Sequence, residues 1–293
     1  MATLFPPFDP QRPRTKRRLR FRHLPIRTVL PNVVTLLALC SGLTAIRMAI
    51  EGRYELAIAA IVLAAVLDGV DGRVARLLKS TSKFGAELDS LTDFVNFGVA
   101  PAVILYTWTL DELRSAGWIV VLVFAIGAAL RLARFNVMLE DTTRPSWQGN
   151  FFIGVPSPAG AIVVLLPIYL GLSGVDADSL GLDGRVGASI VAVYTLVCGF
   201  LMVSRLPTFS GKRFGMRIRR DFILPLFVVV VLVVALFVSF PFEMLSAGSI
   251  LYLACLPLGW RTWERHLEAD RAADLAAKRA AAIDEAEATA PGP

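Results

Sequence analysis

Residues 68–93, DGVDGRVARLLKSTSKFGAELDSLTD, decide how this chain folds, because they place ionisable side chains between long apolar stretches. The segment holds four aspartates, Asp68, Asp71, Asp89 and Asp93. Since each helical residue turns about 100°, the first two share one helix face and the last two share another. Turn-forming residues near positions 80–83 predict that the two helices are antiparallel neighbours. We therefore expect the two carboxylate pairs to face each other.

The composition excludes an ordinary soluble domain. Of the 293 residues, 55% are hydrophobic and 18% are charged. With glycine counted and tyrosine left out, about 61% are apolar, against about 45–50% in soluble proteins. The three cysteines are scattered through apolar stretches, which argues against a disulfide framework and a zinc site. Both histidines lie in the charged tails, so acid–base chemistry inside a membrane must come from carboxylates.

The apolar residues form blocks of about twenty, the length that a helix needs to cross about 30 Å of hydrocarbon. Hydropathy predicts eight spans, near residues 30–49, 55–78, 85–108, 117–138, 157–173, 186–204, 222–239 and 246–260. The first block starts too late and runs too far to be a signal peptide. We expect an all-α, polytopic integral membrane protein with about eight transmembrane helices.

The distribution of lysine and arginine predicts the orientation of these spans. The N-terminal tail is strongly basic, and so is every second loop after it, whereas the loops between are acidic or nearly neutral. Because cytoplasmic loops carry the basic excess, both termini and the four aspartates should face the cytoplasm. The same pattern explains the net charge of +6 and the pI near 9.5 without a nucleic-acid partner. Attraction to anionic lipids is a secondary consequence.

Four converging carboxylates would repel one another strongly, so they need raised pKa values or bound cations. Divalent metal is the simpler answer, since all-oxygen ligands favour Mg²⁺ or Mn²⁺ and four aspartates can hold two ions about 3.5–4 Å apart. Gly72 and Gly85 would let a ligand approach closely, and Arg76 adds a positive charge suited to phosphate. Taken singly, an aspartate could instead pair with Arg73 or Arg76, and either glycine could serve helix packing.

The combination forms a recognisable pattern. Eight positions fit D-x-x-D-G-x-x-A-R-x8-G-x3-D-x3-D: Asp68, Asp71, Gly72, Ala75, Arg76, Gly85, Asp89 and Asp93. This segment resembles the signature of the CDP-alcohol phosphatidyltransferase family. The resemblance implies a membrane-embedded helical bundle that moves a phosphatidyl group from a CDP-linked lipid to an alcohol and releases CMP.

The resemblance also implies a role for each matching residue. Asp68, Asp71 and Asp89 would bind divalent metal, and Asp93 would complete a second metal site and act as the general base. Gly72, Arg76 and Gly85 would receive the CDP group. Asn32 and Thr35 lie in a P-N-x-x-T element that resembles the family's nucleotide-proximal segment, although both residue types also cap helices.

Three further segments, residues 87–102, 131–137 and 151–161, are similar to the bacterial phosphatidylserine synthases of this family. This similarity implies CDP-diacylglycerol and L-serine as substrates, the bacterial inner membrane as location, and a homodimer. Glycerol 3-phosphate, inositol or choline remain alternative acceptors. The candidates for binding serine are Asn96, Arg131, Arg134 and Asn136. The two arginines lie at i and i+3 on one helix face, but both could also be anchors at the cytoplasmic surface.

The expected organisation follows from these boundaries: a basic cytoplasmic tail (1–29), a catalytic core of six helices (30–205), a basic loop with two further helices (206–260) and a charged cytoplasmic tail (261–293). A transporter is the competing functional class, because intramembrane carboxylates also carry ions and protons. It predicts internal repeats and helices broken at the midplane, and the sequence shows neither.

Overall fold

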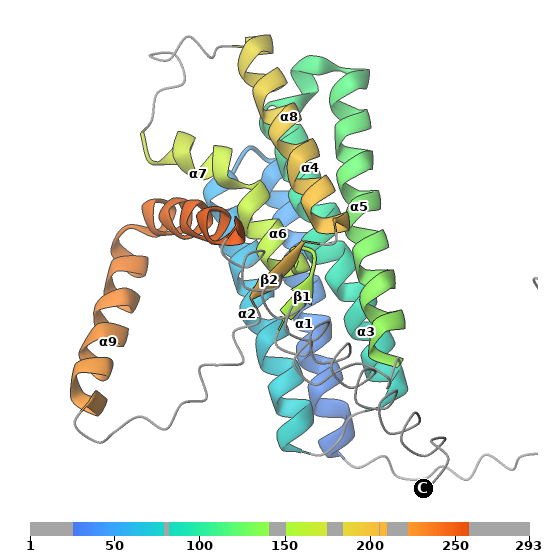
Figure 1. Ribbon diagram of the computed structural model, residues 1–293, viewed down its shortest axis with the longest axis vertical. Coiled ribbons are helices and arrows are strands. Elements are labelled where there is room, and N and C mark those ends of the chain that lie inside the picture. The colour runs from blue at the N-terminus through green and yellow to red at the C-terminus, as the bar shows by residue number, and fades with distance from the viewer. Residues whose placement is uncertain are drawn as a thin grey trace, which may run out of the picture.

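The computed structural model describes residues 26–78, 82–140, 151–174, 184–204, 206–209 and 222–257. These residues form a bundle of helices (Figure 1). The α-helices are α1 (Ile26–Ile50), α2 (Tyr54–Leu77), α3 (Lys83–Phe94), α4 (Ala100–Trp108), α5 (Ser115–Glu140), α6 (Ser157–Val164), α7 (Leu166–Leu172), α8 (Gly184–Val203) and α9 (Ile223–Ser239). A further helix covers Pro241–Pro257.

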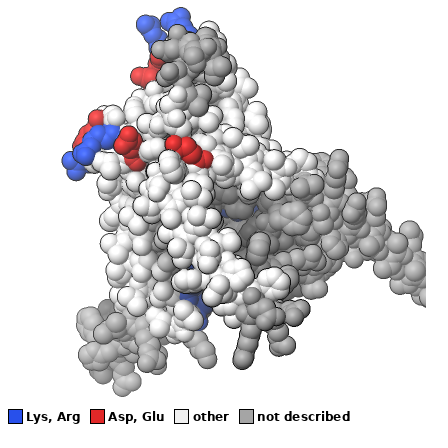
Figure 2. Space-filling view, turned by 90° about the vertical axis from the view of Figure 1, so that its left-hand side faces the viewer, with Lys and Arg blue, Asp and Glu red and all other residues white. Residues whose placement is uncertain are grey.

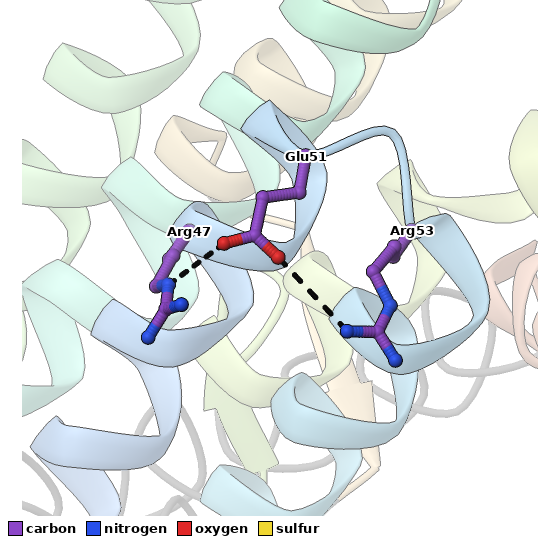
Figure 3. Close-up of polar contacts among 3 residues, drawn as sticks. All are labelled: Arg47, Glu51 and Arg53. Carbon is purple, nitrogen blue, oxygen red and sulfur yellow. Dashed lines mark hydrogen bonds and ion pairs between the residues drawn. The ribbon is translucent and has the colours of Figure 1, made fainter.

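Helices α1 and α2 run side by side as an antiparallel hairpin (Figure 1). Their turn needs Gly52, whose φ of +73° lies in the left-handed region that other residues rarely adopt. Glu51 at this turn accepts from Arg47 Nε at 2.8 Å and lies 4.0 Å from Arg53 Nη1 (Figure 3). These exposed pairs add little stability, so alanines buried along both helices account for the close packing.

One long span is built from three consecutive elements. Helix α3 passes through a π-helical turn, η1 (Val95–Val99), into α4, and together they give an apolar stretch of 26 residues from Lys83 to Trp108. The short 3-10 helix η2 (Leu110–Leu113) then leads into α5. Helices α5 and α8 pack closely at Gly127, where an added Cβ would lie 3.1 Å from the carbonyl oxygen of Gly199. Phe97 and Phe124 are fully buried in the core.

Four described helices are long and apolar enough to cross a membrane: Val29–Ile50, Lys83–Trp108, Ser115–Met138 and Gly184–Val203. Helix α2 has 24 residues, but its last third carries charged side chains, which take it out of this class. The membrane character predicted from hydropathy is confirmed. Figure 2 shows acidic and basic side chains grouped toward the upper part of one face, above a surface almost free of them.

The prediction of about eight spans is not confirmed. The expected span at 157–173 is two short helices, α6 and α7, because the chain breaks at Leu165 and Pro167 lies in the first turn of α7. The expected spans at 222–239 and 246–260 are α9 and the helix Pro241–Pro257, whose axes meet at 117° and count at most as one broken span. None of the residues of α9 is buried, and it projects from the bundle (Figure 1).

The all-α class is confirmed, and the described residues add one short strand pair to the helices. Strands β1 (Phe151–Ile153) and β2 (Pro207–Phe209) form a short antiparallel pair, in which Phe152 is opposite Thr208. Gly154 follows β1 with a φ of +81°, and its amide donates to the carbonyl of Leu206 at 2.8 Å. The pair therefore ties the chain before α6 to the chain after α8. Most of the predicted tails, 1–29 and 261–293, lies outside the described residues.

Candidate active site

Three aspartates converge where the end of α2 approaches α3. Asp68, Asp71 and Asp89 each place one carboxylate oxygen within 4.8 Å of the other two. Asp71 is buried, and the other two are partly buried. Helical spacing aligns Asp68 with Asp71 on α2, and the tertiary fold adds Asp89 from α3. Oxygen ligands at this separation fit a hard divalent cation such as Mg²⁺ or Mn²⁺.

Asp93 lies beside this cluster, one turn after Asp89 on α3. A side-chain hydrogen bond joins its carboxyl group to that of Asp68. Its Oδ1 is buried and has no hydrogen-bond partner among the described residues. The structure therefore places the predicted base next to the three-carboxylate cluster, with one oxygen still unpaired.

An open groove leads to the cluster from the start of α1, the end of α2 and the start of α3. Its lining includes six of the predicted residues: Asn32, Thr35, Asp71, Gly72, Gly85 and Asp89. The groove lies at the opposite end of α1 and α2 from the turn shown in Figure 3.

Hydrogen bonds fix the walls of this groove. Thr35 Oγ1 donates to Asp71 Oδ2 at 2.8 Å and also contacts the carbonyl of Pro31 at 3.1 Å. Ser82 caps α3 by accepting from the amide of Gly85 at 3.0 Å. Ser82 is not among the site residues predicted from the sequence, although a serine directly before an amphipathic stretch is an ordinary helix-capping signal.

The two signature glycines differ in their surroundings. A Cβ on Gly72 would meet no atom within 4 Å, so this residue keeps one wall of the groove open. A Cβ on Gly85 would lie 2.9 Å from Asn32 Oδ1 and 3.2 Å from Ser82 Oγ, so the missing side chain lets α1 and α3 approach. Arg76 is exposed on α2 and is not part of the groove lining.

The four residues expected to bind serine divide into two groups. Arg131 is buried, donates from Nη1 to Ser157 Oγ at 2.7 Å and interacts electrostatically with Asp93. Asn96 is fully buried in η1, and neither of its amide atoms has a partner within the described part of the chain. A Cβ on Gly42 would collide with its side chain.

The other two form contacts between helices. Arg134 Nη1 donates to the carbonyl of Val203 at 2.6 Å and lies 3.5 Å from that of Ser204, so it satisfies carbonyls at the end of α8. Asn136 Nδ2 donates to Ser90 Oγ at 3.0 Å, which links α5 to α3 beside Asp89. Arg131 and Arg134 thus share a helix face but contact different partners.

Known proteins resemble this chain in the same region. Residues 28–201 match the family model of the CDP-alcohol phosphatidyltransferases, and residues 221–257 match a second model described as CDP-alcohol phosphatidyltransferase 2. The chain belongs to the CDP-alcohol phosphatidyltransferase family. The first match contains all eight signature positions and both candidate residues of α1.

Several relatives in this family carry the name CDP-diacylglycerol–serine O-phosphatidyltransferase. The protein of Mycobacterium leprae is 42% identical over 196 residues, which cover 67% of this chain and 61% of that protein. The protein of Mycobacterium bovis is 36% identical over 80% of this chain and 79% of its own length. The protein of Helicobacter pylori is 35% identical over 78% of this chain and 90% of its own length.

The family assignment clarifies what the aspartate cluster can do. CDP-alcohol phosphatidyltransferases generally use divalent metals, and Asp68, Asp71 and Asp89 could bind such an ion. Together with the apolar helices, membership of the family identifies an integral membrane protein. It also favours a transferase over the transporter considered from the sequence.

Proposed function

We propose that this chain transfers the phosphatidyl group of CDP-diacylglycerol to the hydroxyl of L-serine, giving phosphatidylserine and CMP. The observation that carries this proposal is the cluster of Asp68, Asp71 and Asp89 at the head of an open groove within the family's matched region. The names of the relatives support serine as the acceptor. The enzyme would therefore be a phosphatidylserine synthase.

The carboxylates suit two divalent ions, Mg²⁺ or Mn²⁺. Asp68, Asp71 and Asp89 supply closely spaced oxygens, and Asp93 beside Asp68 would complete the second site. The donor set fits hard cations, since it contains no sulfur or imidazole. When bound, such ions neutralise the charge of the pyrophosphate and of the leaving CMP.

The groove would hold the CDP group. Asn32, Thr35, Gly72 and Gly85 line it, and the open space at Gly72 leaves room for the nucleotide to lie against the α2 backbone. Arg76 is exposed beyond the groove, so we assign it the outer part of the bound nucleotide. Thr35 keeps Asp71 oriented through its hydrogen bond.

Asp93 would act as the general base, because a serine hydroxyl is a weak nucleophile until a base lies within hydrogen-bond reach. Asp93 accepts the hydroxyl proton while the serine oxygen forms a bond to the lipid-bearing phosphorus. The bond between that phosphorus and the oxygen of CMP breaks, and CMP leaves with the electron pair. The unpaired Oδ1 of Asp93 supports this role.

The orientation and assembly of the enzyme are also proposals. Basic residues in the N-terminal tail and in alternate loops support a site and two termini on the cytoplasmic side of the bacterial inner membrane. The division into a core at 30–205, two added helices at 206–260 and charged tails is kept as a prediction. We also keep the homodimer that the family resemblance implies.

The test is CMP release by the purified protein in detergent micelles that contain CDP-diacylglycerol and Mn²⁺. We expect CMP with L-serine and none with glycerol 3-phosphate, inositol or choline. Asp93→Asn should lower turnover by about 10²–10⁴-fold. Release of CMP with another alcohol but not with serine would contradict the acceptor assignment, and turnover that persists in EDTA would contradict the metal assignment.

A further inference from the structure

Arg131 is a buried cation that forms no ion pair with a carboxylate of the described residues. Only 7% of the residue is exposed, and Nη1 has a neutral partner, Ser157 Oγ at 2.7 Å. Its Nε has no hydrogen-bond partner, and no carboxylate in the described part of the chain forms an ion pair with it. Burying a charge that has no ion-pair partner is expensive, so this arrangement indicates that an anion binds Arg131 during the reaction cycle.

The surroundings of Arg131 come from elements far apart in the sequence. Asp93 of α3 and Tyr252 of the helix Pro241–Pro257 both interact electrostatically with its guanidinium. Ser157 is the first residue of α6, and the ring of Phe135 lies 5.4 Å below the guanidinium carbon. Four parts of the bundle therefore meet at one cation, next to the proposed base.

More unpaired polar atoms lie near Asp93 along the continuous span of α3 and η1. Thr92 Oγ1 and both amide atoms of Asn96 are buried without a partner among the described residues. Thr92 is 2% exposed and Asn96 is fully buried. Buried polar atoms are nearly always hydrogen-bonded, so a group of unpaired ones points to a ligand with donors and acceptors of its own.

We propose that Arg131 binds the carboxylate of the amino-acid acceptor, with Ser157 positioning its guanidinium and Tyr252 lying on the same side of the subsite. In this arrangement the helix Pro241–Pro257, which lies outside the core match at 28–201, completes the acceptor subsite. The inference deepens the proposed serine transfer and rests on it.

The size of serine fits this assignment. Its hydroxyl group is attached to Cβ and its carboxylate to the adjacent Cα, so only two carbons separate the two groups. With the hydroxyl at Asp93, the carboxylate must therefore fall on side chains that adjoin Asp93, as Arg131 does. Asn96, about one turn after Asp93 in η1, is placed to contact the amino group. Arg134 is excluded from the subsite because its guanidinium binds carbonyls at the end of α8.

The experiment compares two acceptors that differ in the carboxylate. L-Serinamide keeps the hydroxyl and the amino group of L-serine but replaces the carboxylate with a neutral amide. The measurement is the ratio of kcat/KM for serine to kcat/KM for serinamide, in micelles with saturating CDP-diacylglycerol and Mn²⁺. We expect a wild-type ratio well above one and a fall of about 10- to 100-fold in Arg131→Gln, the range for losing a hydrogen bond to a charged group.

Two residues beside Arg131 and a matched control complete the test. Tyr252→Phe and Ser157→Ala should lower the same ratio by a few-fold while leaving the KM for CDP-diacylglycerol unchanged. Arg134→Gln removes a cation from the same face of α5 and should keep the wild-type ratio, whatever it does to turnover.

Each outcome bears on a separate statement. An Arg131→Gln enzyme that keeps the wild-type ratio would overturn the inference while leaving serine transfer intact. If Arg131→Gln does not fold, unchanged ratios in both Tyr252→Phe and Ser157→Ala would overturn it equally. A wild-type protein that releases CMP with another alcohol but not with serine would instead refute the proposed function.

Discussion

Replacing Asp89 by asparagine should make the protein more stable than the wild type without metal and less stable than the wild type with it. Two unit charges 4.8 Å apart, the separation that bounds the cluster, repel by about 3.5 kcal/mol at an effective dielectric constant near 20. Three such pairs sum to about 10 kcal/mol, and Asp89→Asn removes two of them. Because the side chains can relax, we expect only a fraction of this repulsion, about 1–3 kcal/mol, to be gained in the free energy of unfolding. The variant should therefore be more stable than the wild type when metal is absent.

With Mn²⁺ the order should invert, because the ion then attracts three carboxylates in the wild type and only two in the variant. The assay is thermal unfolding in detergent, followed through the fluorescence of the five tryptophans, in EDTA and in Mn²⁺. At about 2 °C per kcal/mol for a protein of this size, the gain in EDTA corresponds to a rise in Tm of a few degrees.

The matched control is Asp111→Asn, which removes an exposed carboxylate from η2, away from the cluster. It should leave the difference in Tm between EDTA and Mn²⁺ at the wild-type value. A wild-type Tm that does not respond to Mn²⁺, together with an Asp89→Asn protein that is less stable in EDTA, would refute the idea that repulsion within the cluster is relieved by cations.

Three further substitutions test the groove. Gly85→Ala should raise the KM for CDP-diacylglycerol and lower stability by up to about 2 kcal/mol, because the new Cβ would lie 2.9 Å from Asn32 Oδ1 and displace it. Steady-state kinetics and unfolding curves measure the two effects. Gly72→Ala should also raise that KM, yet stabilise the protein by about 0.5–1 kcal/mol, since its Cβ meets no atom and alanine favours helix; a lower Tm would contradict this. Thr35→Val removes the 2.8 Å hydrogen bond to Asp71 and should raise the Mn²⁺ concentration for half-maximal activity by about 10-fold, and an unchanged Mn²⁺ titration would exclude an orienting role.

The aspartate cluster was predictable because helical periodicity is local. A spacing of three residues on α2 places Asp68 and Asp71 on one face whatever the rest of the chain does. The tertiary fold then packs α3 mainly against α1, and this brings Asp89 to within 4.8 Å of both. The resemblance to the family is confirmed by the match over residues 28–201.

The acceptor side was less predictable because it depends on where distant elements pack. Helical spacing groups Arg131 with Arg134 on one face of α5, but it does not reveal that Ser157 contacts the first and the end of α8 contacts the second. No local pattern marks Tyr252, which lies more than a hundred residues further along the chain. Only the folded position of the helix Pro241–Pro257 brings it near Arg131.

Hydropathy failed in the C-terminal part for a related reason. It measures how long and how apolar a segment is, and both α9 and the helix Pro241–Pro257 satisfy that test when taken together. It contains no information on direction, so it cannot detect the 117° angle between them. The same limitation hides the break at Leu165, where two half-length helices replace one predicted span.

The predicted span at 55–78 fails for a different reason. Helix α2 is long enough to cross a membrane, but its charged residues keep it out of the candidate spans. Its 24 residues correspond to about 36 Å at 1.5 Å per residue, enough to cross the hydrocarbon layer. Each charged residue at the centre of a membrane helix costs about 2.5–3.5 kcal/mol on insertion, and α2 carries Asp68, Asp71, Arg73 and Arg76. These residues gather near one end, where the groove is open and Arg76 is exposed, so they avoid most of that cost. The charged residues that keep α2 out of the helices apolar enough to cross a membrane are therefore those that the proposed phosphatidyl transfer requires.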